Sequence, residues 1–301
     1  MIEFQDRVAV VTGGGRGLGR AHALLLASRG AAVVVNDLGG ATDGTAASKG
    51  PADEVVDEIG SAGGVAVADY HSVADPEGGE AVIATALEQF GRIDIVVNNA
   101  GILRDRTFSN LEWPDLDAVL DVHLRGAFFV TRPAFLHMKE QGYGRIVVTS
   151  SNAGILGNFG QTNYAAAKMG LVGLMNVLKL EGAKYGIKAN AIAPVARTRM
   201  TEDLLGPLAD KLDPSQVAPV VAYLCSEACP FSGEVWSVGG GSVSRFFVGL
   251  TDGYFKHPDK AGPLTVEDVA DNITAIRDEE GYIVPYSIQD ELTKLGPKLF
   301  G

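Results

Sequence analysis

Short apolar runs rich in β-branched residues alternate with longer amphipathic stretches from the N-terminus to about residue 240. The short runs predict buried strands, at residues 7–12, 31–37, 65–70, 93–98, 145–150 and 187–194. The amphipathic stretches predict helices at residues 17–29, 52–61, 78–90, 113–140 and 163–185. Strands that alternate with helices are joined by right-handed crossovers and lie parallel. The pattern therefore predicts an α/β fold with a doubly wound parallel sheet.

The character of the sequence changes after Gly241. We expect residues 1–241 to form a single dinucleotide-binding domain and residues 242–301 to form a C-terminal extension that packs on this core or on a partner subunit. Within the extension, Thr265 and Asp268 have capping-box spacing and predict a helix that runs to Ile276, followed by a Pro/Gly-rich end. A Gly- and Ala-rich insert at residues 39–50 predicts a surface loop.

The charge balance limits the classes of ligand. The formal net charge of −12 repels phosphate backbones and anionic membrane surfaces, so neither nucleic acid nor membrane is expected as a partner. No apolar run reaches the ~20 residues that span a bilayer. Two cysteines among 301 residues are typical of a reduced compartment. We expect a cytoplasmic protein with a small-molecule substrate.

A glycine-rich loop joins the first predicted strand to the first predicted helix. Gly13, Gly17 and Gly19 permit a tight turn and a close backbone approach, and the helix then directs its N-terminal N–H groups at a pyrophosphate. The loop is a candidate dinucleotide site of the Rossmann type, formed by Gly13, Arg16, Gly17, Leu18 and Gly19.

Asp37 ends the second predicted strand, where an acid can accept hydrogen bonds from the adenosine ribose hydroxyls. The same carboxylate would repel a 2′-phosphate, which favours NAD as the cofactor. Arg16 favours the alternative, because a cation in the glycine loop could bind that phosphate. Asp37 occupies the discriminating position, and NAD is the prediction.

Tyr164 and Lys168 stand four residues apart on a predicted helix and therefore share a face. Ser151, thirteen residues upstream of Tyr164, follows the fifth strand at the edge where doubly wound sheets bind ligands. The fourth strand ends at the same edge, and Asn99 and Gly101 follow it.

Taken together, TGGGRGLG (12–19), NNAG (98–101) and a serine thirteen residues before YAAAK (164–168) resemble the short-chain dehydrogenase/reductase family. The resemblance implies catalysis by Ser151, Tyr164 and Lys168, with an asparagine in the long middle helix completing a proton relay. His123 stands at that position here, and is carried as a fourth catalytic candidate. Pro194-Val195 also departs from the usual Pro-Gly.

Further segments are similar to one branch of this family, the (3R)-hydroxyacyl-CoA dehydrogenase domain of the peroxisomal multifunctional enzyme type 2. They are VNDLGG (35–40), NNAGILRDRTF (98–108), VHLRG (122–126) and GNFGQTNYAAAK (157–168). This resemblance implies oxidation of (3R)-3-hydroxyacyl-CoA with NAD by a homodimer or homotetramer. It places Ser72 and Val73 near the adenine, and Ala196 and Thr198 near the nicotinamide.

Other interpretations stay open at this point. The chain could be a 17β-type hydroxysteroid or steroid-side-chain-CoA dehydrogenase, an NADP-dependent 3-oxoacyl reductase, or a non-catalytic dinucleotide-sensing scaffold. The loop arginines, either solvated or contacts to CoA phosphates, are Arg104, Arg106, Arg197 and Arg199. Cys225 and Cys229 predict one shared helix face, where we expect packing and no metal site. Helix, edge and loop roles without ligand binding are expected of His22, His71 and His257.

Overall fold

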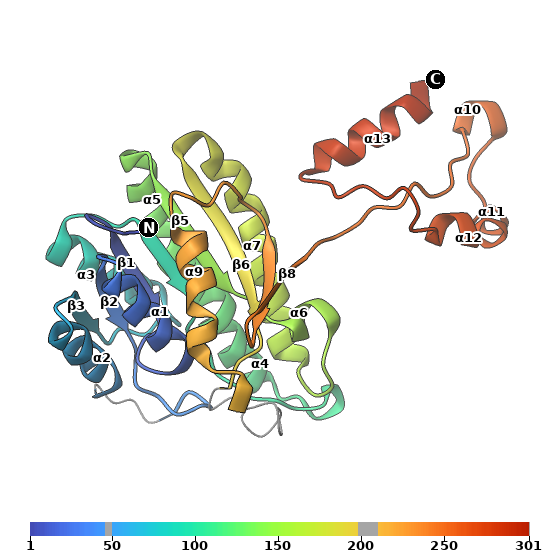
Figure 1. Cartoon of the computed structure of the whole chain (residues 1–301). Coiled ribbons are helices and arrows are strands. Elements are labelled where there is room, and N and C mark those ends of the chain that lie inside the picture. The colour runs from blue at the N-terminus through green and yellow to red at the C-terminus, as the bar shows by residue number, and fades with distance from the viewer. Residues whose placement is uncertain (46–49, 198–209, 301) are drawn as a thin grey trace. The chain divides into compact units, whose positions relative to one another are not determined.

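The protein is described here by a computed structural model, covering residues 1–45, 50–197 and 210–300. Its core is an eight-stranded sheet in the order β3-β2-β1-β4-β5-β6-β7-β8, in which all neighbouring strands from β3 to β7 are parallel (Figure 1). The strands are β1 (Val8–Thr12), β2 (Ala32–Asn36), β3 (Val65–Asp69), β4 (Ile95–Asn98), β5 (Gly144–Thr149), β6 (Ile187–Pro194), β7 (Val235–Gly239) and β8 (Ser242–Phe246). The predicted doubly wound sheet is confirmed.

The strand order reverses at β1, which pairs with β2 on one side and with β4 on the other. The connections that leave the carboxyl ends of β1 and β4 therefore run in opposite directions. A doubly wound sheet opens a crevice at this point, and ligands bind there. The glycine loop after β1 and the residues after β4 form the two sides of that crevice.

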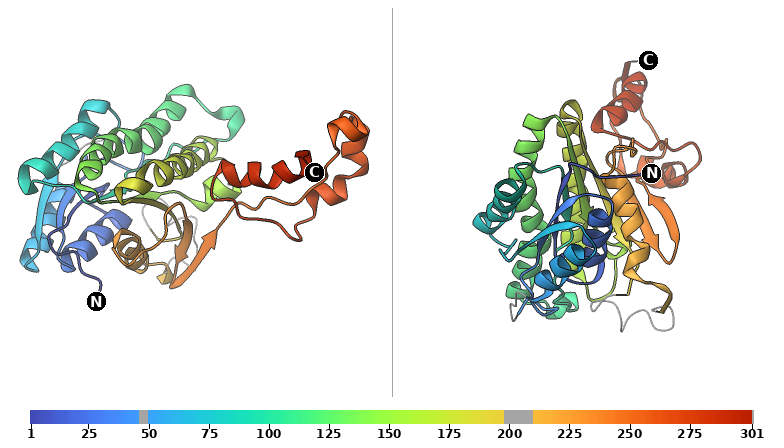
Figure 2. Two further views of the ribbon diagram at one scale, coloured as in Figure 1. Left: turned by 90° about the horizontal axis from the view of Figure 1, so that it is seen from above. Right: turned by 60° about the vertical axis from the view of Figure 1, so that its left-hand side comes forward.

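Helices cover both faces of the sheet (Figures 1 and 2). Residues of α1, α2 and α9 share one apolar core with the strands, and α3, α5 and α7 lie on the opposite face. These helices of the core are α1 (Gly17–Ser28), α2 (Gly50–Ser61), α3 (Pro76–Phe90), α4 (Trp113–Leu120), α5 (Gly126–Gln141), α6 (Asn152–Leu156), α7 (Thr162–Gly182) and α9 (Ala218–Cys225). Short 3₁₀ turns lie at Phe108–Asn110, Ala183–Tyr185 and Pro214–Gln216.

The predicted helix at residues 113–140 is interrupted. It consists of α4, a π-helical segment at Asp121–Arg125, and α5. A π-turn inserts one residue into the helical repeat and often marks a functional site. Here the insertion carries His123, which is buried.

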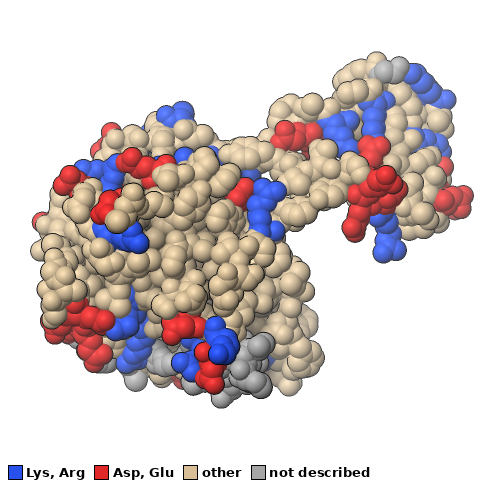
Figure 3. Space-filling model, viewed as in Figure 1, with Lys and Arg blue, Asp and Glu red and all other residues tan. Residues whose placement is uncertain are grey.

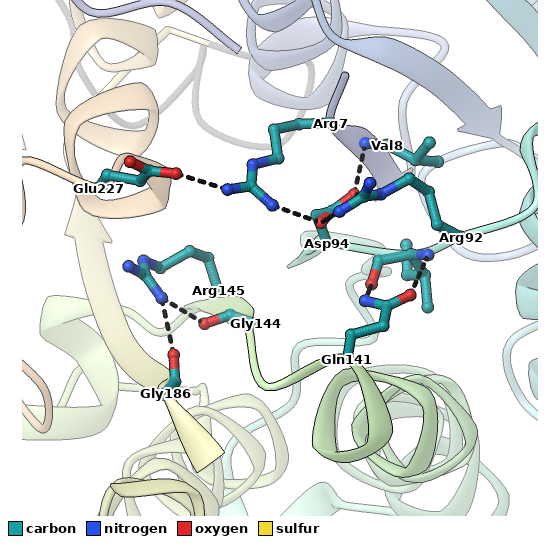
Figure 4. Close-up of polar contacts among 10 residues, drawn as sticks. Arg7, Val8, Arg92, Asp94, Gln141, Gly144, Arg145, Gly186 and Glu227 are labelled. Carbon is teal, nitrogen blue, oxygen red and sulfur yellow. Dashed lines mark hydrogen bonds and ion pairs between the residues drawn. The ribbon is translucent and has the colours of Figure 1, made fainter. Parts of the chain in front are cut away.

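A cluster of charged residues lies at the amino-terminal edge of the sheet, where Arg7 precedes β1 and Asp94 precedes β4 (Figure 4). The fully buried carboxylate of Asp94 accepts hydrogen bonds from Arg7 (3.0 Å), from Arg92 (2.8 and 2.7 Å) and from the Val8 amide (2.9 Å). Arg7 also pairs with Glu227. Because every donor converges on one buried anion, Asp94 fixes the starts of β1 and β4 relative to each other.

The ranges of two strands (β7 and β8) and two helices (α6 and α9) of the core were not predicted from the sequence. β7 and β8 are joined by the two-residue turn of Gly240 and Gly241, whose φ values of +55° and +82° suit a tight hairpin. The predicted boundary at residue 241 thus falls inside this hairpin. The chain divides into two compact units, Met1–Arg245 and Phe246–Gly301.

The second unit contains α10 (Pro258–Ala261), α11 (Val266–Asp271), α12 (Ile273–Arg277) and α13 (Ile288–Phe300). The capping box of Thr265 and Asp268 is present as predicted, but the helix breaks at Asn272. The Pro/Gly-rich end of the chain forms α13, with Pro297 inside the helix. Whether this unit packs on the core or on a partner stays a prediction.

The expectation that Cys225 and Cys229 share a helix face is wrong. Cys225 is the last residue of α9, because Ser226 turns to an extended conformation (ψ 165°) and places Cys229 beyond the helix. Burial raises the pKa of both thiols, so both are inert packing residues. Within the described ranges, no group of three His, Cys, Asp or Glu residues is arranged to hold a metal ion.

No helix in the described part of the chain has the length and apolar character that crossing a membrane requires. On the face shown in Figure 3, acidic and basic side chains are interspersed among the described residues without an extended basic patch.

Candidate active site

A cleft of about 620 Å³ lies at the carboxyl edge of the sheet. It brings together predicted site residues from eight separate segments of the chain. These are Gly13, Arg16, Gly17, Leu18, Asp37, Ser72, Val73, Asn99, Gly101, His123, Ser151, Tyr164, Lys168 and Ala196. Gly19 does not line the cleft, and Thr198 and Arg199 lie outside the described residues.

The glycine loop has the geometry of a phosphate cradle. Gly13 and Gly17 have φ values of +61° and +52°, which non-glycine residues rarely adopt. A Cβ atom on Gly19 would lie 2.0 Å from the carbonyl oxygen of Gly13, so Gly19 acts through packing beneath the loop. The first turn of α1 carries no acidic residue, and its N–H groups are available to an anion.

Asn99 supports this loop from the other side of the crevice. Its Nδ2 atom donates to the carbonyl oxygens of Thr12 (3.1 Å) and Gly13 (3.2 Å). The hydroxyl of Thr12 in turn accepts from the backbone amides of Asn99 (3.0 Å) and Ala100 (3.1 Å). Asn99 therefore fixes the shape of the glycine loop and itself lines the cleft.

Asp37 is half-buried at the wall of the cleft. One carboxylate oxygen accepts from the Gly15 amide (2.8 Å) and the other accepts from the Gly39 amide (2.7 Å). Each oxygen keeps a second lone pair, so the carboxylate can also accept from a pair of hydroxyl groups. Arg16 is exposed on the same wall. The glycine cradle and this acceptor together fit a dinucleotide.

Ser151, Tyr164 and Lys168 line one region of the same cleft. Ser151 is the N-cap of α6, where its hydroxyl accepts from the Ala153 amide (3.1 Å). The ammonium of Lys168 lies 5.5 Å from the centre of the Tyr164 ring and donates to the Thr149 carbonyl oxygen (2.6 Å). The predicted three residues are therefore assembled at one place.

The electrostatics of these groups are set mainly by burial. Burial lowers the pKa of Lys168 from 10.5 to about 7. Burial also raises the pKa of the Tyr164 phenol, and a hydrogen bond with Ser151 counteracts this while the charge of Asp105 adds to it. With the protein groups alone, the phenol therefore stays protonated at neutral pH.

His123 packs edge-on against Tyr164, with ring centres 5.2 Å apart. Its Nε2 atom lies 2.8 Å from the carbonyl oxygen and 3.0 Å from the amide nitrogen of Ile102, and one tautomer can use only one of these contacts. Its Nδ1 atom is buried and has no partner among the described residues. Burial and the charge of Lys168 lower the pKa of His123 well below 6.5, and the hydrogen bond with Ile102 acts against them, so the ring is neutral. Its relay role stays a prediction.

Several residues at the site were missed by sequence reasoning. Gln161, the N-cap of α7, is buried in the cleft wall and donates to Asp105 (2.7 Å). A glutamine three residues before Tyr164, at the start of a predicted helix, was the available signal. The loop that follows β2 also lines the cleft, through Ala41, Thr42 and Gly44. It is held there by a hydrogen bond from the Leu103 amide to the Thr42 carbonyl oxygen (2.9 Å).

The loop arginines are partly committed to acids. Arg104 and Arg106 lie 3.5 and 4.0 Å from carboxylate oxygens of Asp115, and Arg197 lies 3.1 Å from Asp210. A role of these side chains in binding CoA phosphates stays a prediction.

The fold and the cleft define a class of protein, the nicotinamide-dependent oxidoreductases, because one cleft contains both a dinucleotide cradle and a Ser-Tyr-Lys group. The family model of the short chain dehydrogenases matches residues 7–206. The chain belongs to the short-chain dehydrogenase family, whose members bind NAD or NADP and act on hydroxyl groups.

Three relatives indicate the branch. A short-chain type dehydrogenase/reductase of Mycobacterium tuberculosis is 57% identical over 93% of this chain and 97% of its own length. The peroxisomal multifunctional enzyme type 2 of Drosophila melanogaster is 52% identical over 91% of this chain. The hydroxyacyl-CoA dehydrogenase ChsB1 of Mycobacterium tuberculosis is 42% identical over 80% of both chains.

The solved full-length structure of the Drosophila enzyme superposes with a TM-score of 0.84 and 42% sequence identity over 99% of this chain. This chain spans 50% of that structure and 46% of the Drosophila sequence, or about half the length of the multifunctional enzyme. The predicted resemblance to this enzyme is confirmed.

Proposed function

We propose that this chain is an NAD-dependent dehydrogenase that oxidises the 3-hydroxyl of (3R)-3-hydroxyacyl-CoA thioesters to 3-oxoacyl-CoA. The observation that carries the proposal is the placement of Ser151, Tyr164 and Lys168 in the cleft that also contains the glycine cradle and Asp37. The substrate class is supported by the relatives named above, one of which is a hydroxyacyl-CoA dehydrogenase.

In this proposal Tyr164 removes the proton of the substrate hydroxyl. When bound, the oxidised nicotinamide accepts the hydride and brings a positive charge to the site. The ammonium nitrogen of Lys168 lies 5.5 Å from the centre of the Tyr164 ring. The cationic form of Lys168 would stabilise the phenolate form of Tyr164. Ser151 holds the substrate oxygen through its hydroxyl, which lies at the wall of the same cleft.

The choice of NAD rests on Asp37. Its carboxylate accepts hydrogen bonds from the backbone amides of Gly15 and Gly39, which hold it at the wall of the cleft. A 2′-phosphate placed against this anion would be repelled, whereas two ribose hydroxyls would donate to it. Arg16, on the same wall, is the feature that favours NADP, and the experiment below includes NADP for that reason.

The test is NADH formation across a panel of alcohols. The panel holds (3R)- and (3S)-hydroxyacyl-CoA thioesters and a 17β-hydroxysteroid, each with NAD and with NADP. We expect turnover of the 3R thioester with NAD, abolished by Tyr164→Phe and retained by Tyr185→Phe, a matched change outside the cleft lining. Turnover of the steroid alone would contradict the proposed substrate, and turnover with NADP alone would contradict the proposed cofactor. Binding of NADH without any turnover would indicate the alternative of a non-catalytic dinucleotide-sensing scaffold.

We also propose that the protein is a homo-oligomer. Large apolar side chains are 42–51% exposed along α5 and α7, at Phe128, Leu136, Met169, Val177 and Leu180. A monomer rarely leaves such a set in water, and pairing of this face with a second copy would cover it. Sedimentation of a monomer at micromolar concentration would contradict this proposal.

A further inference from the structure

Two hydrogen bonds join a turn in the loop that follows β2 to the loop that follows β4. The Leu103 amide donates to the Thr42 carbonyl oxygen (2.9 Å), and Nε of Arg104 donates to the Asp43 carbonyl oxygen (3.0 Å). Each bond connects residues that are 61 positions apart in the sequence. The two loops therefore form a bridge between distant parts of the chain.

This bridge crosses the point where the strand order reverses. β2 and β4 lie on either side of β1, so a contact between the loops that follow them passes across the carboxyl end of β1, where the glycine loop begins. Gly17 of the glycine loop and Thr42 of the bridge line the same cleft. A dinucleotide that extends from Asp37 toward Tyr164 would therefore pass between the glycine loop and the bridge.

The turn on the β2 side, residues 41–45, is held together by its own hydrogen bonds. The Ala41 amide donates to the Thr45 carbonyl oxygen (2.6 Å), and the Gly44 amide donates to the Ala41 carbonyl oxygen (3.0 Å). The Asp43 carboxylate accepts from the amide (3.0 Å) and the hydroxyl (2.7 Å) of Thr45. Gly39, which precedes the turn, has a φ value of +72°. A change of backbone angle at Gly39 would thus move the turn as one unit.

The β4 side of the bridge is fixed to the core. Asn163 on α7 donates to the Arg104 carbonyl oxygen (2.9 Å), and His123 contacts the backbone of Ile102. The turn has no such anchor, because within the described ranges its hydrogen bonds to the rest of the chain are those with Leu103 and Arg104. Opening of the bridge is therefore a movement of the turn away from a fixed loop.

We propose that the turn at residues 41–45 is a strap, latched by Leu103 and Arg104, that closes over the middle of the bound dinucleotide and opens when the cofactor enters or leaves. The inference rests on the proposed binding of NAD in this cleft. Loss of the latch makes opening easier, while the glycine cradle and Asp37 remain in place. The strap thus sets the rate at which NADH leaves after each turnover.

The first test measures NADH release by stopped-flow fluorescence, with excess NAD as the competitor. Arg104→Met removes the Nε donor, and we expect release to accelerate roughly five- to tenfold, the factor that one such hydrogen bond contributes. Arg106→Met is the matched control, because Arg106 also approaches Asp115 but makes no hydrogen bond to the strap among the described residues. It should change the rate less than about twofold. An unchanged rate in Arg104→Met, or equal acceleration in both variants, would overturn the proposal.

The second test closes the strap covalently. A Cβ atom on Gly44 would lie 3.9 Å from the Cβ atom of Ile102, within the about 3.5–4.5 Å that a disulfide spans. The double variant Gly44→Cys/Ile102→Cys is loaded with NADH and oxidised, which should slow release at least roughly tenfold until the disulfide is reduced. Gly44→Cys alone places a side chain at the same φ of +88° without a cross-link, and should release NADH equally fast before and after oxidation. Equal release from the oxidised and reduced double variant would contradict the strap.

Both tests use NADH without substrate, so they separate the strap from the proposed chemistry. A latch effect in a protein that does not oxidise the 3R thioester would overturn the proposed function and leave the strap standing. Normal oxidation of the thioester with release rates that ignore both the latch and the disulfide would overturn the strap alone. Absence of NADH binding to the wild-type protein would overturn the proposed cofactor and the strap together.

Discussion

The ammonium of Lys168 lies 5.5 Å from the centre of the Tyr164 ring, one turn along α7, while its three donors are largely shielded from water and one bonds the Thr149 carbonyl oxygen. Burial lowers the pKa of this lysine to about 7. The position is therefore unfavourable for a cation, which has consequences for the stability of the folded protein.

Replacement of Lys168 by methionine should abolish activity without loss of the fold. The pKa of this lysine is lower in the folded protein (about 7) than its ordinary value of 10.5, so the unfolded chain binds more protons between these pH values. The buried lysine therefore lowers the free energy of unfolding at pH 7. Lys168→Met removes this effect but also loses the hydrogen bond to Thr149, so the free energy of unfolding should rise by about 1–3 kcal/mol in total. Urea denaturation at pH 7, beside an activity assay, measures both. A destabilised variant would contradict this reading of the site.

His22 should make the protein sensitive to mild acid. The ring is buried in α1 with neither nitrogen bonded among the described residues, and burial lowers its pKa to about 3. As pH falls below 6.5, the unfolded chain takes up a proton that the folded chain does not, so stability should fall by up to about 1.4 kcal/mol per pH unit. The free energy of unfolding, measured from pH 7 to 4, should decline less steeply in His22→Leu. Parallel profiles for the two proteins would show that His22 is not the cause.

Removal of the Asp37 carboxylate should relax the cofactor preference. Asp37→Ser abolishes the repulsion of a 2′-phosphate and leaves Arg16 on the same wall, so the ratio of kcat/KM for NAD over NADP should fall by about tenfold or more. Asp57→Asn on α2, outside the cleft lining, is the matched control and should keep the original ratio. A preference unchanged by Asp37→Ser would mean that another residue selects the cofactor.

The Asp94 cluster should contribute to stability and not to catalysis. Asp94→Ala leaves Arg7 and Arg92 without their common anion, and should lower the free energy of unfolding by about 2–4 kcal/mol, a value reduced because both arginines are partly exposed. Glu58→Gln, which breaks the exposed pair with Arg20, should cost less than about 0.5 kcal/mol. Kinetic constants should be retained in folded Asp94→Ala, because Arg7 and Asp94 precede β1 and β4, at the ends of the strands opposite the cleft. A large change in kcat would contradict that separation.

The parts of the fold that follow from local patterns were predicted from the sequence. Six of the seven parallel strands, β1 to β6, depend on residues within a few positions of one another, and so do the glycine loop at Gly13 and the Tyr164–Lys168 pair. Their assembly at one edge then follows from the rules of parallel sheets.

Features that depend on distant contacts could not be predicted in this way. The bond between Gln161 and Asp105 joins residues 56 positions apart, and the contact of His123 with Ile102 depends on the π-turn that rotates the helix. The partly exposed β7 and β8 have too few buried residues to give a strand pattern. Cys229 was assigned to a helix because its spacing from Cys225 is helical, whereas the backbone turns at Ser226.

The central claim is hydride removal from a (3R)-3-hydroxyacyl-CoA with Tyr164 as the base. The most direct measurement uses that thioester with deuterium at carbon 3, together with NAD, and determines the isotopic mass of the reduced cofactor. The account predicts that each NADH formed carries one deuterium, and that Tyr164→Phe forms almost none. Absence of reduced cofactor from the wild-type protein with the 3R thioester, or label transfer from the 3S thioester alone, would contradict it.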